Sequence, residues 1–114
     1  MSTRSRIGVL NENGSIESVY CHSDGYPEGV GETLTSNYNS EEKAREIISL
    51  GDLSFLGDDL TSGNTAAYGR DRGEDDVSSK KSMTEKGFIT LASKTGGEYA
   101  YLFTAGHWEC FKVW

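Results

Sequence analysis

The stretch Tyr20-Cys21-His22-Ser23-Asp24-Gly25-Tyr26-Pro27 predicts a sharp corner between a strand and a helix. A β-prone run ends at Cys21, and Asp24-Gly25 follows it. The Asp side chain can accept bonds from nearby backbone N–H groups, and Gly tolerates a positive φ. Pro27 suits the first position of a helix, where its missing N–H costs nothing. We therefore expect Gly25 to take a positive φ in a tight turn that leads into a helix.

Before the corner, two β-prone runs at residues 5–10 and 15–21 flank Asn11-Glu12-Asn13-Gly14. An Asn-Gly pair between such runs predicts a hairpin. Neither face of the second run is cleanly polar, which is typical of an inner strand covered on both sides.

After the corner, residues 28–38 place apolar side chains at helical spacing, and residues 40–50 predict a second helix. Ser40 is the expected N-cap of that helix, and Gly51 its expected end. Residues 52–57 are expected to form a turn or a single helical turn that buries its apolar side chains.

The last part of the chain predicts a short strand at 65–69, a flexible segment at 77–81 and a C-terminal hairpin. Ser82-Met83-Thr84-Glu85 has the spacing of a capping box, so we expect a helix over 83–94, although this stretch is also β-prone. The aromatic runs 98–104 and 107–114 flank the tight turn of the hairpin.

These elements predict one α+β domain spanning residues 1–114. Its sheet is expected to be mainly antiparallel, with about five strands in N- and C-terminal hairpins and two or three helices packed on it. With 114 residues, of which 35% are hydrophobic, the chain can bury a core without metal or disulfide support.

The charge is negative and uneven. The net charge is −7, and the segment from Ile7 to Gly69 carries eleven acidic residues against only Lys43 and Arg45, a net of −9. Phosphate binding depends on Lys and Arg, so this segment argues against direct contact with nucleic acid. A basic protein surface is the better match, and the alternative is that the acidity only keeps the protein in solution.

Seven acidic residues are candidates for contact with such a partner. They follow the two predicted helices and the loop after them: Glu28, Glu32, Glu41, Glu42, Glu46, Asp58 and Asp59.

A second candidate site joins the corner to the densest charge cluster of the chain. Its residues are His22, Asp24, Tyr26, Arg70, Asp71, Arg72 and Glu74. Arginine forks in such a place can bind a carboxylate or a phosphate. The alternative is a solvated loop whose opposite charges pair with one another.

Catalytic and metal chemistry have weak support. His22, Asp24 or His107 could form a catalytic site with a cysteine nucleophile. However, the sequence contains no recognised nucleophile, nucleotide-binding or zinc-binding motif. The acidic pairs and triplets match no EF-hand loop. We expect no enzyme activity, no cofactor and no metal, and we expect Cys21 and Cys110 to be reduced, packed thiols.

The chain resembles a family of small proteins encoded by bacteriophages and prophages. The similarity rests on residues 15–27, Gly51-Asp52-Leu53-Ser54, Tyr68-Gly69-Arg70-Asp71-Arg72-Gly73-Glu74 and Glu98-Tyr99-Ala100-Tyr101-Leu102-Phe103 with Trp108. That family usually has an aromatic residue where this chain has Ser23. Its members are mostly of unassigned activity, so the resemblance implies a phage context more than a biochemical role.

By analogy with small acidic anti-CRISPR proteins, we expect a phage-encoded interaction protein of the host cytoplasm. It would act as a DNA mimic that binds a host defence protein or ribonucleoprotein complex through its acidic surface and blocks nucleic acid binding. We expect a monomer or homodimer that binds neither nucleic acid nor membrane directly. The alternative is a small-ligand or nucleotide-binding protein, or a small enzyme, with its site at the corner and the Arg70 cluster.

Overall fold

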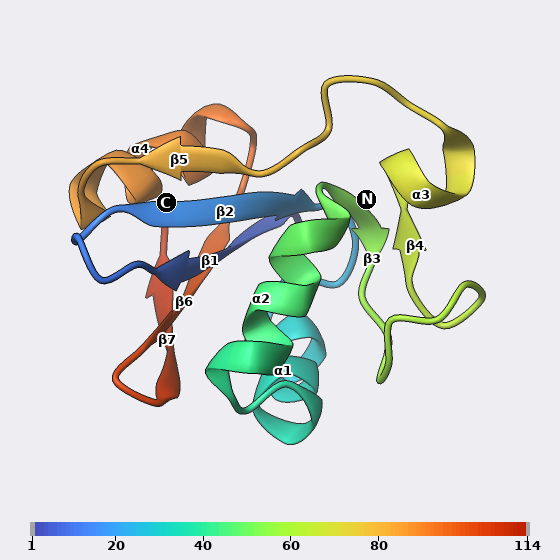
Figure 1. Ribbon diagram of the computed structural model, residues 1–114, viewed down its shortest axis with the longest axis horizontal. Helices are drawn as coiled ribbons and strands as arrows, with labels where there is room; N and C mark the ends of the chain where they lie inside the picture. Colours follow the sequence, from blue (N-terminus) through green and yellow to red (C-terminus); the bar gives the residue numbers. More distant parts are fainter. Residues whose placement is uncertain (1, 114) are drawn as a thin grey trace.

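The computed structural model describes residues 2–113 and shows an α+β fold built on a mixed, seven-stranded sheet (Figure 1). The strand order is β4-β3-β2-β1-β6-β7, and β5 pairs with β2 outside this path. The strands are β1 Ser5–Leu10, β2 Ile16–Cys21, β3 Leu53–Phe55, β4 Ala66–Ala67, β5 Lys80–Ser82, β6 Tyr99–Thr104 and β7 His107–Lys112. The helical elements are the π-helical turn η1 Pro27–Gly31 and the α-helices α1 Glu32–Asn37, α2 Glu41–Leu50, α3 Tyr68–Arg72 and α4 Glu85–Lys94.

The sheet differs from the expected one in strand number and direction. Both hairpins are confirmed, since β1 pairs with β2 and β6 with β7 in antiparallel register. However, β1 pairs in parallel with β6 and β2 in parallel with β3, so the sheet is mixed. The strands β3 and β5 were not predicted, because three residues are too few to show an alternating pattern.

Helices cover both faces of the sheet, which places β1, β2 and β6 in the interior. The larger apolar cluster joins inward side chains of these strands, such as Val9 and Phe103, to α1 and α2. The smaller cluster joins the opposite face, including Ile16 and Leu102, to Phe88 of α4. The prediction of an inner β2 covered on both sides is therefore confirmed.

The corner has a different backbone from the predicted one. Asp24 takes the left-handed conformation, with a φ of 55°, and Gly25 does not have a positive φ. Gly25 is required for another reason: a Cβ there would lie 2.8 Å from Cβ of Ser5 and 2.9 Å from the carbonyl oxygen of Thr3. The turn thus packs its backbone directly against the start of β1. Pro27 occupies the first turn of η1, as predicted.

The three predicted helical regions are helical, but the first is divided into η1 and α1, and α3 was not predicted. Ser40 caps α2 by accepting a bond from the Lys43 amide, and Gly51 ends the helix at a φ of 78°. The helix over the β-prone stretch exists as α4, but Thr84 is its N-cap instead of Ser82, which belongs to β5.

Two segments between α2 and β5 were predicted wrongly. Residues 53–55 form β3 and not a helical turn, and Phe55 is 39% exposed rather than buried. The predicted strand over 65–69 stops at Ala67, where α3 begins. The charged residues Arg70, Asp71 and Arg72 therefore lie in a helical turn, not in a loop.

Candidate functional site

The seven acidic residues predicted to contact a partner are all exposed. We call them the acidic face: Glu28, Glu32, Glu41, Glu42, Glu46, Asp58 and Asp59. They lie on η1, α1, α2 and the loop after β3. Figure 1 shows α1 and α2 away from α4, and the two apolar clusters place them on the opposite face of the sheet from α4. Among the described residues, only Glu41 of this set forms an ion pair, with Arg45 at 2.9 Å.

The loop after β3 joins the acidic face through specific contacts. Asp58 accepts a 3.3 Å bond from Nδ2 of Asn37 at the end of α1. Glu46, Asp58 and Asp59 line one open hollow of about 440 Å³, together with Lys43 and Arg70. Three carboxylates from two elements thus border the same concave surface.

Asp59 also has a structural role in this loop. It accepts bonds from the hydroxyl and the amide of Thr61 and from Nδ2 of Asn64. These donors hold the pKa of its carboxyl below the ordinary value, with the Thr61 hydroxyl as the largest cause. Asp59 is therefore ionised, and it also holds the conformation of its own loop.

Arg70, one of the two arginines of the second candidate site, makes four hydrogen bonds within the protein. Arg70 donates from Nε and Nη2 to the two carboxylate oxygens of Asp71, each at 3.0 Å. It also donates to the carbonyl oxygens of Leu60 and Thr65. Its guanidinium thus ties the loop 60–65 to α3, and no edge of the fork is left open for a ligand.

Asp71 completes this clamp. It accepts bonds from the Ala67 amide at 2.8 Å and from the Ser62 hydroxyl at 2.7 Å. The Arg70 guanidinium and these donors hold the pKa of Asp71 well below its usual range. Arg72 instead lies over the ring of Tyr68, with its Cζ 5.1 Å from the ring centroid.

The residues of the corner pair locally. The Tyr20 hydroxyl and Nδ1 of His22 are 2.7 Å apart, and the Tyr26 hydroxyl donates to Asp24 at 3.2 Å. Within residues 2–113, no hydrogen bond or ion pair joins this group to Arg70, Asp71, Arg72 or Glu74. The two halves of the second candidate site are thus held by separate contacts.

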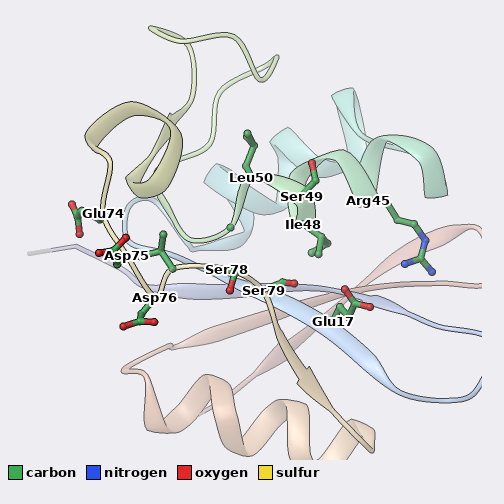
Figure 2. A pocket seen from close by; sticks show the side chains of 12 residues that line it. Glu17, Arg45, Ile48, Ser49, Leu50, Glu74, Asp75, Asp76, Ser78 and Ser79 are labelled. Atoms are coloured by element: carbon green, nitrogen blue, oxygen red, sulfur yellow. The ribbon is translucent and has the colours of Figure 1, made fainter.

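A polar groove lies between the end of α2 and the segment 74–79, and the sequence did not indicate it (Figure 2). Its volume is about 580 Å³. Arg45 and Glu17 lie at one end, and Glu74, Asp75 and Asp76 lie at the other, with the α2 side chains between them. Across residues 2–113, no three His, Cys, Asp or Glu side chains converge as a metal site would require.

The two cysteines occupy different environments. Cys21 is buried in the larger core, and burial raises the pKa of its thiol to about 12. Cys110 is exposed, so its predicted packing is wrong, and partial burial still raises its thiol pKa. His107 was the remaining candidate to activate a cysteine, and its Nε2 lies 3.3 Å from Oε2 of Glu109. Neither thiol therefore has the lowered pKa that an activated nucleophile needs.

A second groove, lined by lysines, lies between β5 and α4. Its volume is about 580 Å³, and Lys80, Lys81, Lys86 and Lys94 are among the residues that line it. The sequence analysis missed this groove because it treated 77–81 as flexible. The helical spacing of Lys86 and Lys94 was the available signal.

Comparisons of the chain with protein-family models, curated proteins and solved structures find no match. Among the described residues, no helix has the length and apolar character needed to cross a membrane.

Proposed function

We propose that this protein is a non-enzymatic interaction protein whose acidic face binds a basic surface on a nucleic-acid-handling protein. The observation that carries this proposal is the set of seven exposed carboxylates on η1, α1, α2 and the loop after β3, of which only Glu41 forms an ion pair within the described chain. Unpaired exposed charge of one sign attracts the opposite sign at long range and speeds association.

The proposed mechanism is competition. A partner that binds phosphates through Lys and Arg presents fixed positive charge. The carboxylates of the acidic face can occupy the positions that the phosphates take on that partner. The hollow bordered by Glu46, Asp58 and Asp59 adds a concave site for a protruding basic side chain. This is the behaviour expected of a DNA mimic, and the phage context and inhibition of a host defence complex belong to the same proposal.

The small-ligand alternative has less support. It needs Arg70 and Arg72 as a pair for a carboxylate or phosphate, and the Arg70 donors are taken by Asp71, Leu60 and Thr65, which leaves Arg72 over the Tyr68 ring as the other arginine. A ligand there would have to break the clamp that holds residues 60–65.

The first experiment is affinity capture with the immobilised full-length chain from nuclease-treated bacterial lysate. We expect one protein or complex to be retained in stoichiometric amount, to elute as salt rises, and to be displaced by duplex DNA. If duplex DNA added after capture binds the retained partner without releasing it from this protein, competition is refuted.

A further inference from the structure

The groove between β5 and α4 has the opposite charge from the rest of the molecule. None of the described residues that line it is acidic, and its lysines are exposed. Within the described chain, the ion pairs are Arg45 with Glu41, Arg70 with Asp71, and His107 with Glu109, so the groove lysines form none. In a protein of net charge −7, this positive charge is concentrated in one place.

The secondary structure sets the spacing of these charges. Lys86, Thr90 and Lys94 follow one another at intervals of four residues, so they share one face of α4 over about 12 Å. Lys80 reaches the groove from β5 on its other side. Lys81 contributes less positive charge to the groove, because Glu17 lies opposite it in the β2–β5 pairing.

A buried arginine adds positive charge beside β5. Arg6 is 1% exposed and donates from Nε to Oγ of Ser18 at 2.7 Å, while its Nη1 has no partner. Ser18 is the register partner of Lys80. Burial lowers the pKa of Arg6, and the charge of Asp52 partly opposes this. The guanidinium keeps its charge, since an arginine is protonated throughout the ordinary pH range.

The other polar groups of the groove suit phosphate oxygens. Thr84 and Thr90 are exposed and line the groove with the lysines, and the Thr84 hydroxyl also accepts the bond from the Gly87 amide that caps α4. Lysine and hydroxyl side chains are among the groups that donate hydrogen bonds to the nucleic-acid backbone, and these contacts do not depend on sequence. Among residues 2–113, no aromatic side chain lines the groove. The described lining therefore offers no platform for stacking single-stranded bases, and this favours a duplex over a single strand.

We propose that the groove between β5 and α4 binds the sugar-phosphate backbone of a nucleic-acid duplex, with Lys80, Lys86 and Lys94 as the phosphate-binding residues. The expectation of no direct nucleic-acid contact came from the acidic first two thirds of the chain. The groove lies outside that segment, in the final third. The inference does not depend on the proposed function, because α4 and the acidic face lie on different sides of the sheet.

The test is fluorescence anisotropy of a labelled DNA duplex with the full chain, at a series of salt concentrations. Three phosphate contacts predict that log Kobs falls with log salt with a slope of about −2.7. The variant Lys86→Ala with Lys94→Ala should weaken binding at least tenfold at low salt and reduce the slope to about −1. Alanine favours helix, so α4 should persist in this variant.

The matched control is Lys43→Ala with Lys112→Ala, which removes the same charge outside the groove. It should bind the duplex within about twofold of the parent protein. The inference is overturned if the parent shows no saturable binding or if the control loses as much affinity as the groove variant. Tighter binding of a single strand of the same sequence, or of inorganic polyphosphate, would also overturn it.

Discussion

The hydroxyl of Tyr101 donates a buried 2.7 Å hydrogen bond to the carbonyl oxygen of Gly25. This bond ties the corner between β2 and η1 to the middle of β6, and the two residues are 76 positions apart in the chain. Burial raises the pKa of this hydroxyl well above its usual range, so it remains a donor. The position of η1 on the sheet, and with it the start of the acidic face, depends on this contact.

Removing that donor should destabilise the fold. In Tyr101→Phe, the Gly25 carbonyl is left without its side-chain partner, and we expect a loss of about 1–3 kcal/mol of unfolding free energy in urea. Tyr26→Phe is the control, since the Tyr26 bond to Asp24 is exposed, and it should change stability by less than about 0.5 kcal/mol. Equal stability of the two variants would show that the corner is not held by Tyr101.

Adding one methyl group at the corner should also be costly. In Gly25→Ala, the new Cβ would meet backbone atoms of Thr3 and Arg4 at 2.9 Å, and backbone cannot move aside as a side chain can. We expect a loss of about 1–3 kcal/mol, as for other overpacked sites. Thermal unfolding within a degree of the parent protein would mean that the corner lies farther from β1 than described.

Stability should fall as the pH rises above about 9. The pKa values of Cys21 and Tyr38 are raised to about 12 by burial, from ordinary values of 9.0 and 10.0. Above pH 9 the unfolded chain therefore binds fewer protons than the folded one, and the unfolding free energy decreases with pH. Urea midpoints between pH 8 and 11 measure this slope.

The variant Cys21→Ala isolates the contribution of the thiol. Its stability at pH 8 will be lower because a core group is lost, but its decline with pH should be shallower than that of the parent. A parent protein whose urea midpoint is constant from pH 8 to pH 11 would contradict the burial of these groups.

The Arg70 clamp predicts a local effect on loop dynamics. The amides of Asn64 and Thr65 donate to the Thr61 carbonyl inside the loop that Arg70 holds. In Arg70→Ala these amides should exchange with solvent at least tenfold faster, because the loop loses its ties to α3. Arg72→Ala, which removes only a stacking contact with Tyr68, should leave their exchange unchanged. If Arg70→Ala instead abolishes partner binding with no change in exchange, Arg70 is a binding residue.

Local sequence signals predicted the local structure well. Ser40 and Gly51 mark the ends of α2, and the Asn-Gly turn places Gly14 at a φ of 87°. In each case, neighbouring residues determine the backbone. The parallel pairing of Ser5 with Tyr99 has no such signal, since it joins segments at opposite ends of the chain. It is consistent with the helices that cover both faces of β1, as is usual for parallel strands.

The candidate sites also contain some features that the sequence predicted and others that it did not. The exposure of the acids follows from helix periodicity, which places Ala44 and Ile47 inward and Glu42 and Glu46 outward. The sequence could not reveal that Arg70 holds the loop 60–65, because two of its acceptors are backbone carbonyls of that loop. The lysine groove was missed because it is assembled from β5 and α4, which become neighbours only when β5 joins the sheet.

The most direct test of the proposed function compares two variants of equal net charge. One replaces Glu32, Glu42 and Glu46 of the acidic face with Gln. The other replaces Glu74 and Glu98 with Gln and Asp75 with Asn, outside that face. Asp59 is left intact because it holds its loop, and Glu41 because it pairs with Arg45.

The measurement is the rate of association of each variant with the partner recovered from lysate, between about 50 and 300 mM salt. We predict that the acidic-face variant associates at least tenfold more slowly at low salt, while the control stays within about twofold of the parent. The difference should shrink as salt rises, since screening acts beyond about 10 Å at 0.1 M. Equal rates for the two variants, or rates that do not depend on salt, would contradict binding through the acidic face.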